Sequence, residues 1–282
     1  MGVLDGKAVV ITGAGRGLGR AYAVHAARSG AAVLVNDIDA EPAEEVAGSI
    51  RAAGGCAVAS IHSVADPGQA GELIERCVAR FGAIDGLVNN AGLNYQVPPW
   101  EDDPGRMRAL VEVNVLGSLY CGLAAVKTMR ARGGGVIVNV GSGSMLGKPN
   151  GAAYSASKGA VASMTFSWAV DLAECGIRVN AVSPLAWTRM VAADAQERQR
   201  TTPQQTPDRI APLVTYLLSD LSEGITGQMI RFVGDKLLIV RQPAVKAPVL
   251  VRDHWAVEDI AKAFEGELAD ALESPPAQRW AL

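Results

Sequence analysis

The chain has 282 residues, of which 49% are hydrophobic and 20% charged, and its formal net charge is −3 at pH 7. This composition is typical of a folded domain with a large apolar core, and it excludes collagen-like and disordered chains. The net charge is slightly negative, so the composition does not indicate a basic surface for binding nucleic acid. No apolar run reaches the roughly 18 residues of a membrane helix. Because the first residues also show no signal peptide, we expect a cytoplasmic protein without nucleic-acid or membrane partners.

Short apolar, β-branched runs alternate with helical stretches along most of the chain. Continuously apolar strands are typical of a parallel sheet that helices cover on both faces. The strict alternation predicts an α/β fold with a doubly wound, Rossmann-type parallel sheet of about seven strands. Strands are expected near residues 7–12, 32–36, 57–61, 86–89, 136–140, 178–182 and 229–233, and helices near 18–28, 42–53, 68–81, 104–131, 153–175 and 207–219.

Residues 241–282 break this alternation and predict a C-terminal extension after a single domain of residues 1–240. Within the extension, Ile260, Phe264, Leu268 and Leu272 recur every four residues with charges between them. This spacing is typical of an amphipathic helix that needs a surface to cover. The extension either packs on its own domain, or crosses to a neighbouring subunit or roofs a pocket.

A glycine-rich turn follows the first expected strand. It reads T-G-x-x-x-G-x-G, with Thr12, Gly13, Gly17 and Gly19 at the fixed positions, whereas the strict G-x-G-x-x-G pattern fails because residue 18 is leucine. Such a turn lets the backbone approach a pyrophosphate and points the first amides of the next helix at it. A tight structural turn is the alternative, but the position between the first strand and the first helix favours dinucleotide binding.

An acidic residue follows the second expected strand. Asp37 lies 18 residues after Gly19, where a carboxylate would bond the adenosine ribose hydroxyls and repel a 2′-phosphate. It therefore favours NAD over NADP as the cofactor. Two neighbours temper this prediction, because Arg16 could reach a phosphate and Asp39 could share the role of Asp37.

A set of polar residues further along the chain carries candidate chemistry. Asn114 and Ser142 precede Tyr154 and Lys158, which are four residues apart and so share one face of a helix. A phenol near pKa 10 is a poor acid–base at neutral pH, and a neighbouring ammonium lowers its pKa by favouring the phenolate. The pair therefore predicts general acid–base catalysis by the tyrosine.

Together these motifs resemble those of the short-chain dehydrogenases/reductases, over roughly residues 4–235. The resemblance implies that Tyr154 exchanges a proton with the substrate oxygen, and that Lys158 bonds the nicotinamide ribose and lowers the pKa of the phenol. It also implies that Ser142 bonds the substrate oxygen and that Asn114 holds a water linking Lys158 to solvent. The motifs that carry the resemblance are Thr12-Gly13-x-x-x-Gly17-x-Gly19, Asn89-Asn90-Ala91-Gly92, Asn114, Ser142 and Tyr154-x-x-x-Lys158.

The sequence departs from the family pattern in three places, one of which is Pro184-Leu185, where the family has Pro-Gly at the entrance to the substrate lid. Ser142 lies 12 residues before Tyr154 where the family has 13, so Ser144 is a possible substitute. Ser63 stands where the family places an adenine-side aspartate. The sequences around Asn36-Asp37 and Ser63-Val64, together with the extended tail, also resemble the hydroxyacyl-CoA dehydrogenase-type members.

The resemblance further implies which residues line the cofactor. The glycine turn would hold the pyrophosphate, Ser63 and Val64 would lie near the adenine, and Trp187 and Thr188 would hold the nicotinamide carboxamide. The expected cofactor-binding residues are Gly13, Arg16, Gly17, Leu18, Gly19, Asp37, Ile38, Ser63, Val64, Asn90, Ala91, Gly92, Tyr154, Lys158, Trp187 and Thr188.

The sequence thus favours an oxidoreductase that transfers a hydride between NAD(H) and a secondary alcohol or ketone. One alternative is an NADPH-dependent reductase of 3-oxoacyl thioesters, and a second is a non-catalytic dinucleotide-sensing protein. No spacing of His, Cys, Asp and Glu resembles a metal site. Apolar residues on the helices near 104–131 and 153–175 suggest a homodimer or homotetramer. The polar lid segment, about 189–207, gives no rule for the substrate.

Overall fold

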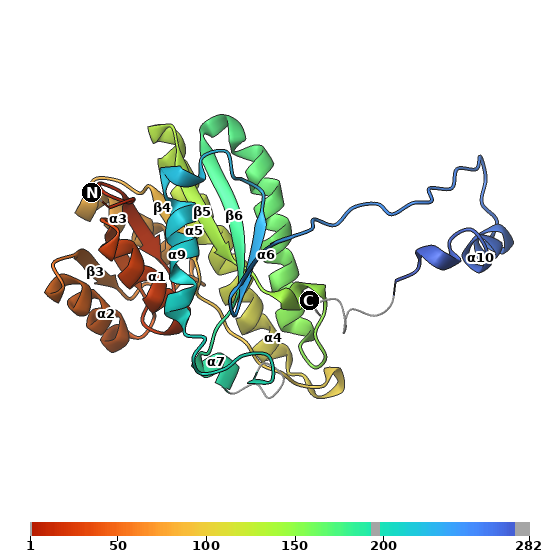
Figure 1. The fold of residues 1–282 in the computed structure, drawn as a ribbon, viewed down its shortest axis with the longest axis horizontal. Helices are drawn as coiled ribbons and strands as arrows, with labels where there is room; N and C mark the ends of the chain where they lie inside the picture. The colour runs from red at the N-terminus through yellow and green to blue at the C-terminus, as the bar shows by residue number, and fades with distance from the viewer. Residues whose placement is uncertain (1, 193–197, 274–282) are drawn as a thin grey trace. The chain divides into compact units, whose positions relative to one another are not determined.

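The computed structural model describes residues 2–192 and 198–273, and the chain divides into two compact units, Met1–Val240 and Arg241–Leu282. Within the described residues, the first unit is built on an eight-stranded sheet of order β3-β2-β1-β4-β5-β6-β7-β8 (Figure 1). Strands β1 to β7 are parallel, which confirms the predicted doubly wound α/β fold. The strands are β1 Ala8–Ile11, β2 Ala32–Asn36, β3 Cys56–Ser60, β4 Gly86–Asn89, β5 Gly135–Val140, β6 Ile177–Leu185, β7 Met229–Val233 and β8 Lys236–Val240.

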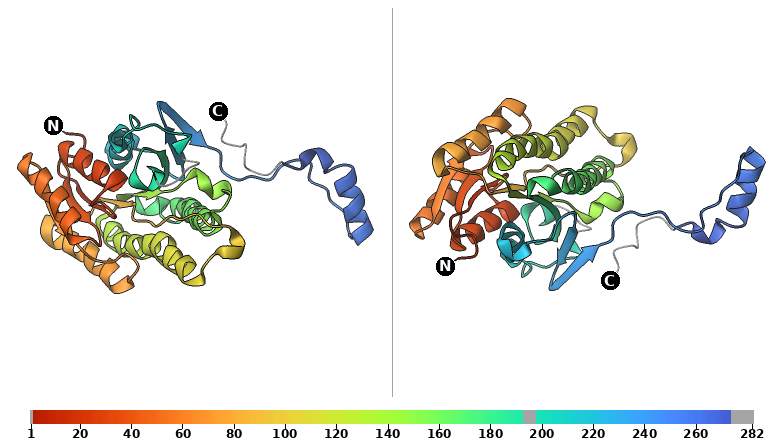
Figure 2. Two further views of the ribbon diagram at one scale, coloured as in Figure 1. Left: turned by 90° about the horizontal axis from the view of Figure 1, so that it is seen from below. Right: turned by 90° about the horizontal axis from the view of Figure 1, so that it is seen from above.

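Helices cover both faces of this sheet (Figure 2). Helices α1, α2 and α9 pack over one face, where their apolar residues join one large buried cluster. Helices α3, α5 and α6 pack over the other face and share a second cluster. The sheet is therefore buried on both sides, which explains its continuously apolar strands. The bounds are α1 Gly17–Arg28, α2 Ala40–Ala52, α3 Pro67–Phe81, α4 Pro104–Val111, α5 Gly117–Arg132, α6 Ala152–Asp171, α7 Arg189–Ala192 and α9 Ala211–Leu218.

The eighth strand was not expected from the sequence. β8 is antiparallel to β7, with Val233 opposite Lys236, so only Gly234 and Asp235 form the turn. Gly234 has a φ of +64°, a conformation that glycine adopts at no steric cost. A two-residue Gly-Asp turn between apolar runs is a hairpin signal, and the break in βα alternation at this point concealed it.

The order of the strands reverses between β1 and β4, which lie side by side in the sheet. In such a fold the connections that leave these two strands diverge, and a crevice opens outside the carboxyl ends of the strands. The glycine turn leaves β1 at this edge, and Asn89-Asn90-Ala91-Gly92 leaves β4 there. The topology therefore brings together the motifs that the sequence keeps far apart.

Helix α4 continues through a π-helical turn, Glu112–Leu116, into α5. By length and composition alone, the combined stretch Pro104–Arg132 could cross a membrane, which corrects the expectation that no stretch reaches that length. This is weak evidence, because core helices of water-soluble proteins meet the same criterion. Here α5 packs against α3, β4 and β5, and Cys121, Ala125 and Met129 are fully buried. The stretch forms part of the helical layer over the sheet.

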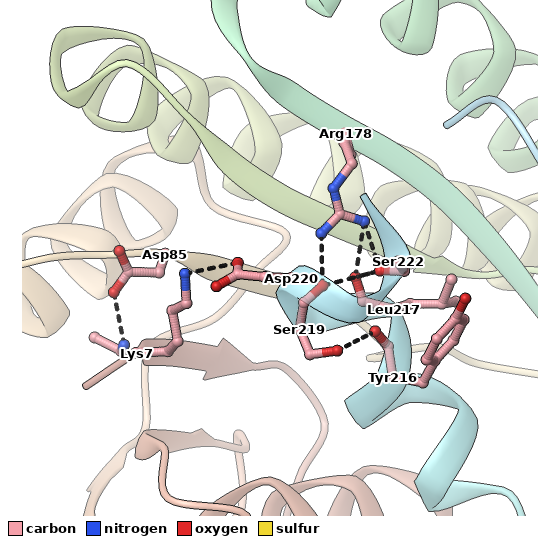
Figure 3. Close-up of polar contacts among 9 residues, drawn as sticks. Lys7, Asp85, Arg178, Tyr216, Leu217, Ser219, Asp220 and Ser222 are labelled. Atoms are coloured by element: carbon pink, nitrogen blue, oxygen red, sulfur yellow. Dashed lines mark hydrogen bonds and ion pairs between the residues drawn. The ribbon is translucent and has the colours of Figure 1, made fainter. Parts of the chain in front are cut away.

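At the opposite, amino edge of the sheet, Arg178 of β6 closes the end of α9 (Figure 3). Its guanidinium donates hydrogen bonds to the carbonyl oxygens of Leu217 (3.1 Å) and Ser219 (2.9 Å) and to Ser222 Oγ (2.8 Å). The last carbonyls of a helix have no partner within it, so a cation there satisfies them and complements the helix dipole. Arg178 is thus a structural residue, and it lies at the edge of the sheet opposite to the glycine turn.

The second unit contains the helix α10, Val257–Glu265. Ile260 and Phe264 lie on it, but the helix ends before Gly266, so Leu268 and Leu272 fall outside the predicted amphipathic helix. Contacts within the unit hold it: Lys246 Nζ donates to the Ala271 carbonyl at 3.0 Å. The four-residue period predicts a longer helix than the one that forms. The observed helix is shorter because it ends at Gly266.

Candidate active site

The glycine turn after β1 is shaped for close approach to a ligand. Gly13 and Gly17 have φ angles of +62° and +55°, which other residues rarely adopt. A Cβ added at Gly19 would lie 2.2 Å from the Gly13 carbonyl oxygen and 2.5 Å from Asn90 Nδ2. The helix α1 begins at Gly17 with no side-chain cap from Arg16 and no acidic residue in its first turn. Its first amides are therefore free for an anion such as a pyrophosphate, so these residues fit a dinucleotide.

Thr12 and Asn90 brace the two connections that meet at the switch point. Thr12 Oγ1 accepts hydrogen bonds from the backbone amides of Asn90 and Ala91, both at 3.0 Å. In return, Asn90 Nδ2 donates to the carbonyl oxygens of Thr12 (2.8 Å) and Gly13 (2.9 Å). These bonds fix the glycine turn against the connection after β4. Asn90 thus has a bracing role, and its contact to a cofactor stays a prediction.

Asp37 lies directly after β2, beside the glycine turn. Its Oδ2 accepts from the amide of Gly15 at 2.9 Å, and its Oδ1 accepts from the amide of Asp39 at 3.1 Å. The next residue, Ile38, is 72% exposed, unusually much for an isoleucine. Arg16 forms an ion pair with Asp39. The structure therefore places Asp37 beside Arg16 and Asp39, the two neighbours that the sequence suggested could modify its role.

Lys158 is buried on α6, one helical turn after Tyr154. Its Nζ donates to the carbonyl oxygen of Val140, the last residue of β5, at 2.7 Å. The ammonium lies 5.7 Å from the centre of the Tyr154 ring. Burial disfavours the charged form and lowers the pKa of Lys158 from its ordinary 10.5 to about 8. The lysine thus carries a positive charge at pH 7 close to the phenol.

Asn114 lies in the π-helical turn and is almost fully buried. Its carboxamide accepts from the amide of Leu93 (2.7 Å) and donates to the Leu93 carbonyl (2.9 Å) and to Ser157 Oγ (3.0 Å). Single π-helical turns are frequent at functional sites. These bonds fix the connection after β4 against α6. Sequence reasoning missed Leu93 and Ser157 as partners, although Ser157 stands next to Lys158 in the chain.

Gly92 leaves the space between Asn114 and Lys158 open. A Cβ placed on Gly92 would lie 3.2 Å from Asn114 Oδ1 and 3.8 Å from Lys158 Nζ. The asparagine oxygen and the ammonium therefore face one small volume beside the backbone of Gly92. This arrangement supports the predicted polar link between the two side chains.

Ser142 and Ser144 lie together after β5, at the start of a short 3₁₀ helix, Gly143–Leu146. Ser142 Oγ accepts from the amide of Ser144 at 3.1 Å, and the two hydroxyls are 3.2 Å apart. The two candidate serines therefore present linked hydroxyls at the carboxyl edge of the sheet. A substrate oxygen bonded to either hydroxyl would therefore also lie close to the other hydroxyl.

The remaining candidates lie in the connections after β3 and β6. Ser63 donates its amide to Gln69 Oε1 at 2.9 Å. Val64 is buried, and a Cβ on Gly117 of α5 would lie 2.8 Å from it, so its side chain packs in the core. Thr188 borders the glycine turn, because its Cγ2 lies 3.7 Å from where a Cβ of Gly17 would be.

Trp187 donates its amide to the carbonyl oxygen of Gln205 at 2.7 Å, so the start and the end of the lid segment meet. Within that segment, residues 193–197 lie outside the described part of the chain. In the ranges 2–192 and 198–273, no group of three or more His, Cys, Asp or Glu side chains could hold a metal ion.

The doubly wound sheet, the glycine turn at its switch point and the Tyr154–Lys158 pair define a Rossmann-type oxidoreductase that binds a nicotinamide dinucleotide. A family profile described as short chain dehydrogenase matches residues 7–200. The chain belongs to this short-chain dehydrogenase family, as its motifs suggested, and acts on an alcohol or ketone.

Individual relatives agree with this assignment. The chain is 38% identical over 234 residues to a cis-4-hydroxycyclohexanecarboxylate dehydrogenase of Sinomonas cyclohexanicum, covering 79% of this chain and 94% of the relative. It is similar to the crystal structure of a short chain dehydrogenase from Mycobacterium avium, with a TM-score of 0.87 and 31% identity. That likeness covers 97% of this chain and 98% of the other, so it extends past Val240.

A second similar solved structure is that of a reductase. The 3-ketoacyl-(acyl-carrier-protein) reductase from Brucella melitensis, complexed with NADH, is 33% identical with a TM-score of 0.75. This likeness covers 81% of this chain and 97% of the reductase.

Proposed function

We propose that the protein interconverts a secondary alcohol and a ketone with NAD(H) as its cofactor, and that Tyr154 is the general acid–base. The observation that carries the proposal is the buried ammonium of Lys158, held by Val140 at the carboxyl edge of the sheet close to the Tyr154 ring. This edge also carries the glycine turn. A positive charge beside a phenol favours the phenolate, which a proton acceptor at neutral pH requires.

The residues of the site have separate tasks in this proposal. When bound, the nicotinamide accepts or supplies the hydride. Tyr154 Oη takes the hydroxyl proton of the alcohol during oxidation and returns it to the carbonyl oxygen during reduction. The linked hydroxyls of Ser142 and Ser144 hold the substrate oxygen, and Lys158 stabilises the phenolate.

Proton exchange with solvent then needs a path out of this buried site. Asn114 Oδ1 and Lys158 Nζ face one volume beside Gly92, and a water there would connect the ammonium to the backbone of the Leu93 connection. We assign Asn114 a positioning role, because its carboxamide fixes that connection on two sides.

The cofactor would lie along the carboxyl edge, with its pyrophosphate on the first amides of α1. The family uses either NAD or NADP. The NAD preference proposed here rests on Asp37, whose carboxylate stands after β2 with two backbone amides holding it. A carboxylate at this position bonds ribose hydroxyls and repels a 2′-phosphate.

For the substrate, we propose a small alicyclic secondary alcohol. The relative from Sinomonas cyclohexanicum acts on such a compound, and its identity extends over most of both chains. Leu93, Met145 and Met190 provide partly or largely exposed apolar side chains in the connections after β4, β5 and β6.

The test is a panel of cyclohexanol, cis-4-hydroxycyclohexanecarboxylate and an acyclic secondary alcohol, each with NAD and with NADP. NADH formation that is fastest with a cyclic alcohol supports the proposal. Turnover confined to the acyclic alcohol, or to NADP, contradicts the substrate or the cofactor assignment respectively.

Reduction of 3-oxoacyl thioesters is the second candidate, because the Brucella melitensis reductase is similar over nearly its whole length. It predicts oxidation of NADPH by an acetoacetyl thioester. The ion pair between Arg16 and Asp39 argues against the use of NADPH in this candidate, because Asp39 engages the guanidinium that could otherwise bind the 2′-phosphate.

We also propose a cytoplasmic homodimer or homotetramer. Helices α5 and α6 each expose a large apolar side chain, Leu123 with 56% and Val170 with 77% of its surface accessible. By contrast, Trp168 is partly buried and packs against Gly122. Light scattering after size exclusion measures the assembly, and a monomer contradicts it.

A further inference from the structure

The residue Asp39 occupies an unusual position for a carboxylate. It is the N-cap of α2, yet its side chain makes no capping hydrogen bond to that helix. The Asp39 carboxylate forms an ion pair and a hydrogen bond with the guanidinium of Arg16 instead. An aspartate at an N-cap usually stabilises the helix through its side chain, so the bond to Arg16 replaces a favourable local contact.

We propose that Asp39 is a specificity-determining residue, which keeps the Arg16 guanidinium from binding the 2′-phosphate of NADP. The inference rests on the proposed dinucleotide site and deepens it. In this account two carboxylates have different tasks. Asp37 faces the ribose position directly, and Asp39 neutralises and holds the one cation in the glycine turn.

The position of Arg16 makes it the natural ligand for such a phosphate. It immediately precedes α1 and stands in the turn next to Gly15, whose amide bonds Asp37. A guanidinium is well suited to bidentate phosphate recognition. Without a partner, a cation at the N-terminus of α1 would also be unfavourable, because that end of the helix dipole is positive. Asp39 therefore neutralises the charge of Arg16, which would otherwise be available to bind an anion.

Further charges around Arg16 strengthen this arrangement. The hydrogen bond to Asp39 is the largest cause that raises the pKa of Arg16 above its ordinary value, and the nearby charges of Asp37 and Glu41 act in the same direction. Of these three acids, Asp39 forms the ion pair, whereas Asp37 is held by the amides of Gly15 and Asp39. Glu41, which is exposed on the first turn of α2, thus serves as a control for charge alone.

The rival explanation is that Asp37 alone excludes NADP and that Arg16 and Asp39 form an ordinary surface pair. Exposed ion pairs contribute little to stability, so the pair itself is no evidence of function. The two accounts differ in coupling. If Asp39 restrains Arg16, the effect of removing Arg16 on NADP affinity depends on whether Asp39 is present.

A double-mutant cycle on the full-length protein tests this. Dissociation constants for NAD and NADP are measured by calorimetry, without turnover, for the wild type, Asp39→Asn, Arg16→Gln and the double variant. We expect Asp39→Asn to raise the NADP-to-NAD affinity ratio about fivefold, the size of one exposed charge contact. Arg16→Gln is expected to change NADP affinity less than about twofold alone, and to abolish the gain in the Asp39→Asn background.

The control variant is Glu41→Gln, which removes one nearby negative charge without touching the bond to Arg16. It is expected to give a clearly smaller gain than Asp39→Asn. An equal gain, or an equal effect of Arg16→Gln in both backgrounds, overturns the role of Asp39 while leaving the dinucleotide site intact. Absence of NAD and NADP binding by the wild type overturns the site itself and this inference with it.

Discussion

Lys158 donates a hydrogen bond from its buried ammonium to the backbone carbonyl of Val140 at the end of β5, over 2.7 Å. The bond fixes the charge at the edge of the sheet where Tyr154 also lies, 5.7 Å from ammonium to ring centre. The contact only partly replaces the water that the ammonium loses, as the lowered pKa of Lys158 shows. The protein therefore maintains a positive charge at this position at a cost in folding free energy.

This cost predicts a pH dependence of stability. The pKa of Lys158 falls from 10.5 in the unfolded chain to about 8 in the folded protein. Between these values the unfolded chain binds more protons, so this group makes the folded state more stable as pH rises. The penalty, roughly 3 kcal/mol at 1.36 kcal/mol per unit, is fully present below pH about 8 and disappears above pH about 10.5.

Comparison with Lys158→Met in the cofactor-free protein measures this effect. The variant also loses the bond to Val140, but this loss is the same at every pH. It therefore does not affect how the difference in unfolding free energy changes with pH. The wild type should gain up to about 3 kcal/mol of unfolding free energy relative to the variant between pH 8 and pH 10.5. A difference that stays constant with pH in urea titrations would contradict this prediction, because it would show that burial leaves the pKa of the lysine unchanged.

Asn114 is predicted to matter for stability as well as turnover. Asn114→Ala leaves both backbone groups of Leu93 and the hydroxyl of Ser157 without their partner. Because buried polar groups lose more than the bond itself, we expect a loss of about 2–4 kcal/mol in unfolding free energy. Ser157→Ala removes one of these bonds, together with the bond from Ser157 Oγ to the carbonyl oxygen of Tyr154, and should cost about 1 kcal/mol. Equal costs for the two variants would contradict the bracing role of Asn114.

The glycine turn is predicted to tolerate no side chain at Gly19. A Cβ there would meet the Gly13 carbonyl and Asn90, so Gly19→Ala should weaken NAD binding more than about tenfold and cost about 1–3 kcal/mol of stability. Gly71 in α3 is the matched control, since a Cβ there has nothing within 4 Å. Gly71→Ala should raise stability by about 0.5–1 kcal/mol and leave binding unchanged. Calorimetry and urea unfolding check both results.

Arg178 is predicted to serve folding and not chemistry. Arg178→Ala removes three charge-assisted bonds at the end of α9 and should lower the unfolding free energy by about 2–4 kcal/mol. Since Arg178 lies at the amino edge of the sheet, kcat measured well below the unfolding temperature should stay within about twofold of the wild type. A large fall in kcat without a fall in stability would contradict this division of the sheet into two edges.

Much of the fold follows from the sequence, because parallel strands buried on both faces leave a clear apolar pattern. The motif residues Thr12, Asp37 and Asn114 also lie where the chain order and the topology together require. The hairpin strand β8 and the early end of α10 were not predicted, since each depends on a short glycine-containing segment that interrupts a longer pattern.

Some of the site could not be predicted because it depends on contacts over long sequence distances. The partners of Asn114 lie 21 and 43 residues away, at Leu93 and Ser157, and no local spacing connects them. The bond between Arg16 and Asp39 likewise joins residues on two βα connections. The sequence shows which residue types are present, but only the structure shows which of these residues pair.

In the proposed reaction, Tyr154 moves the proton while the nicotinamide carries the hydride. The most direct measurement compares wild type and Tyr154→Phe in NADH formation from the best alcohol of the panel, with NAD affinity determined in parallel. We expect kcat to fall by at least about a hundredfold while NAD still binds within about threefold of the wild type. A Tyr154→Phe variant that keeps full turnover would contradict it.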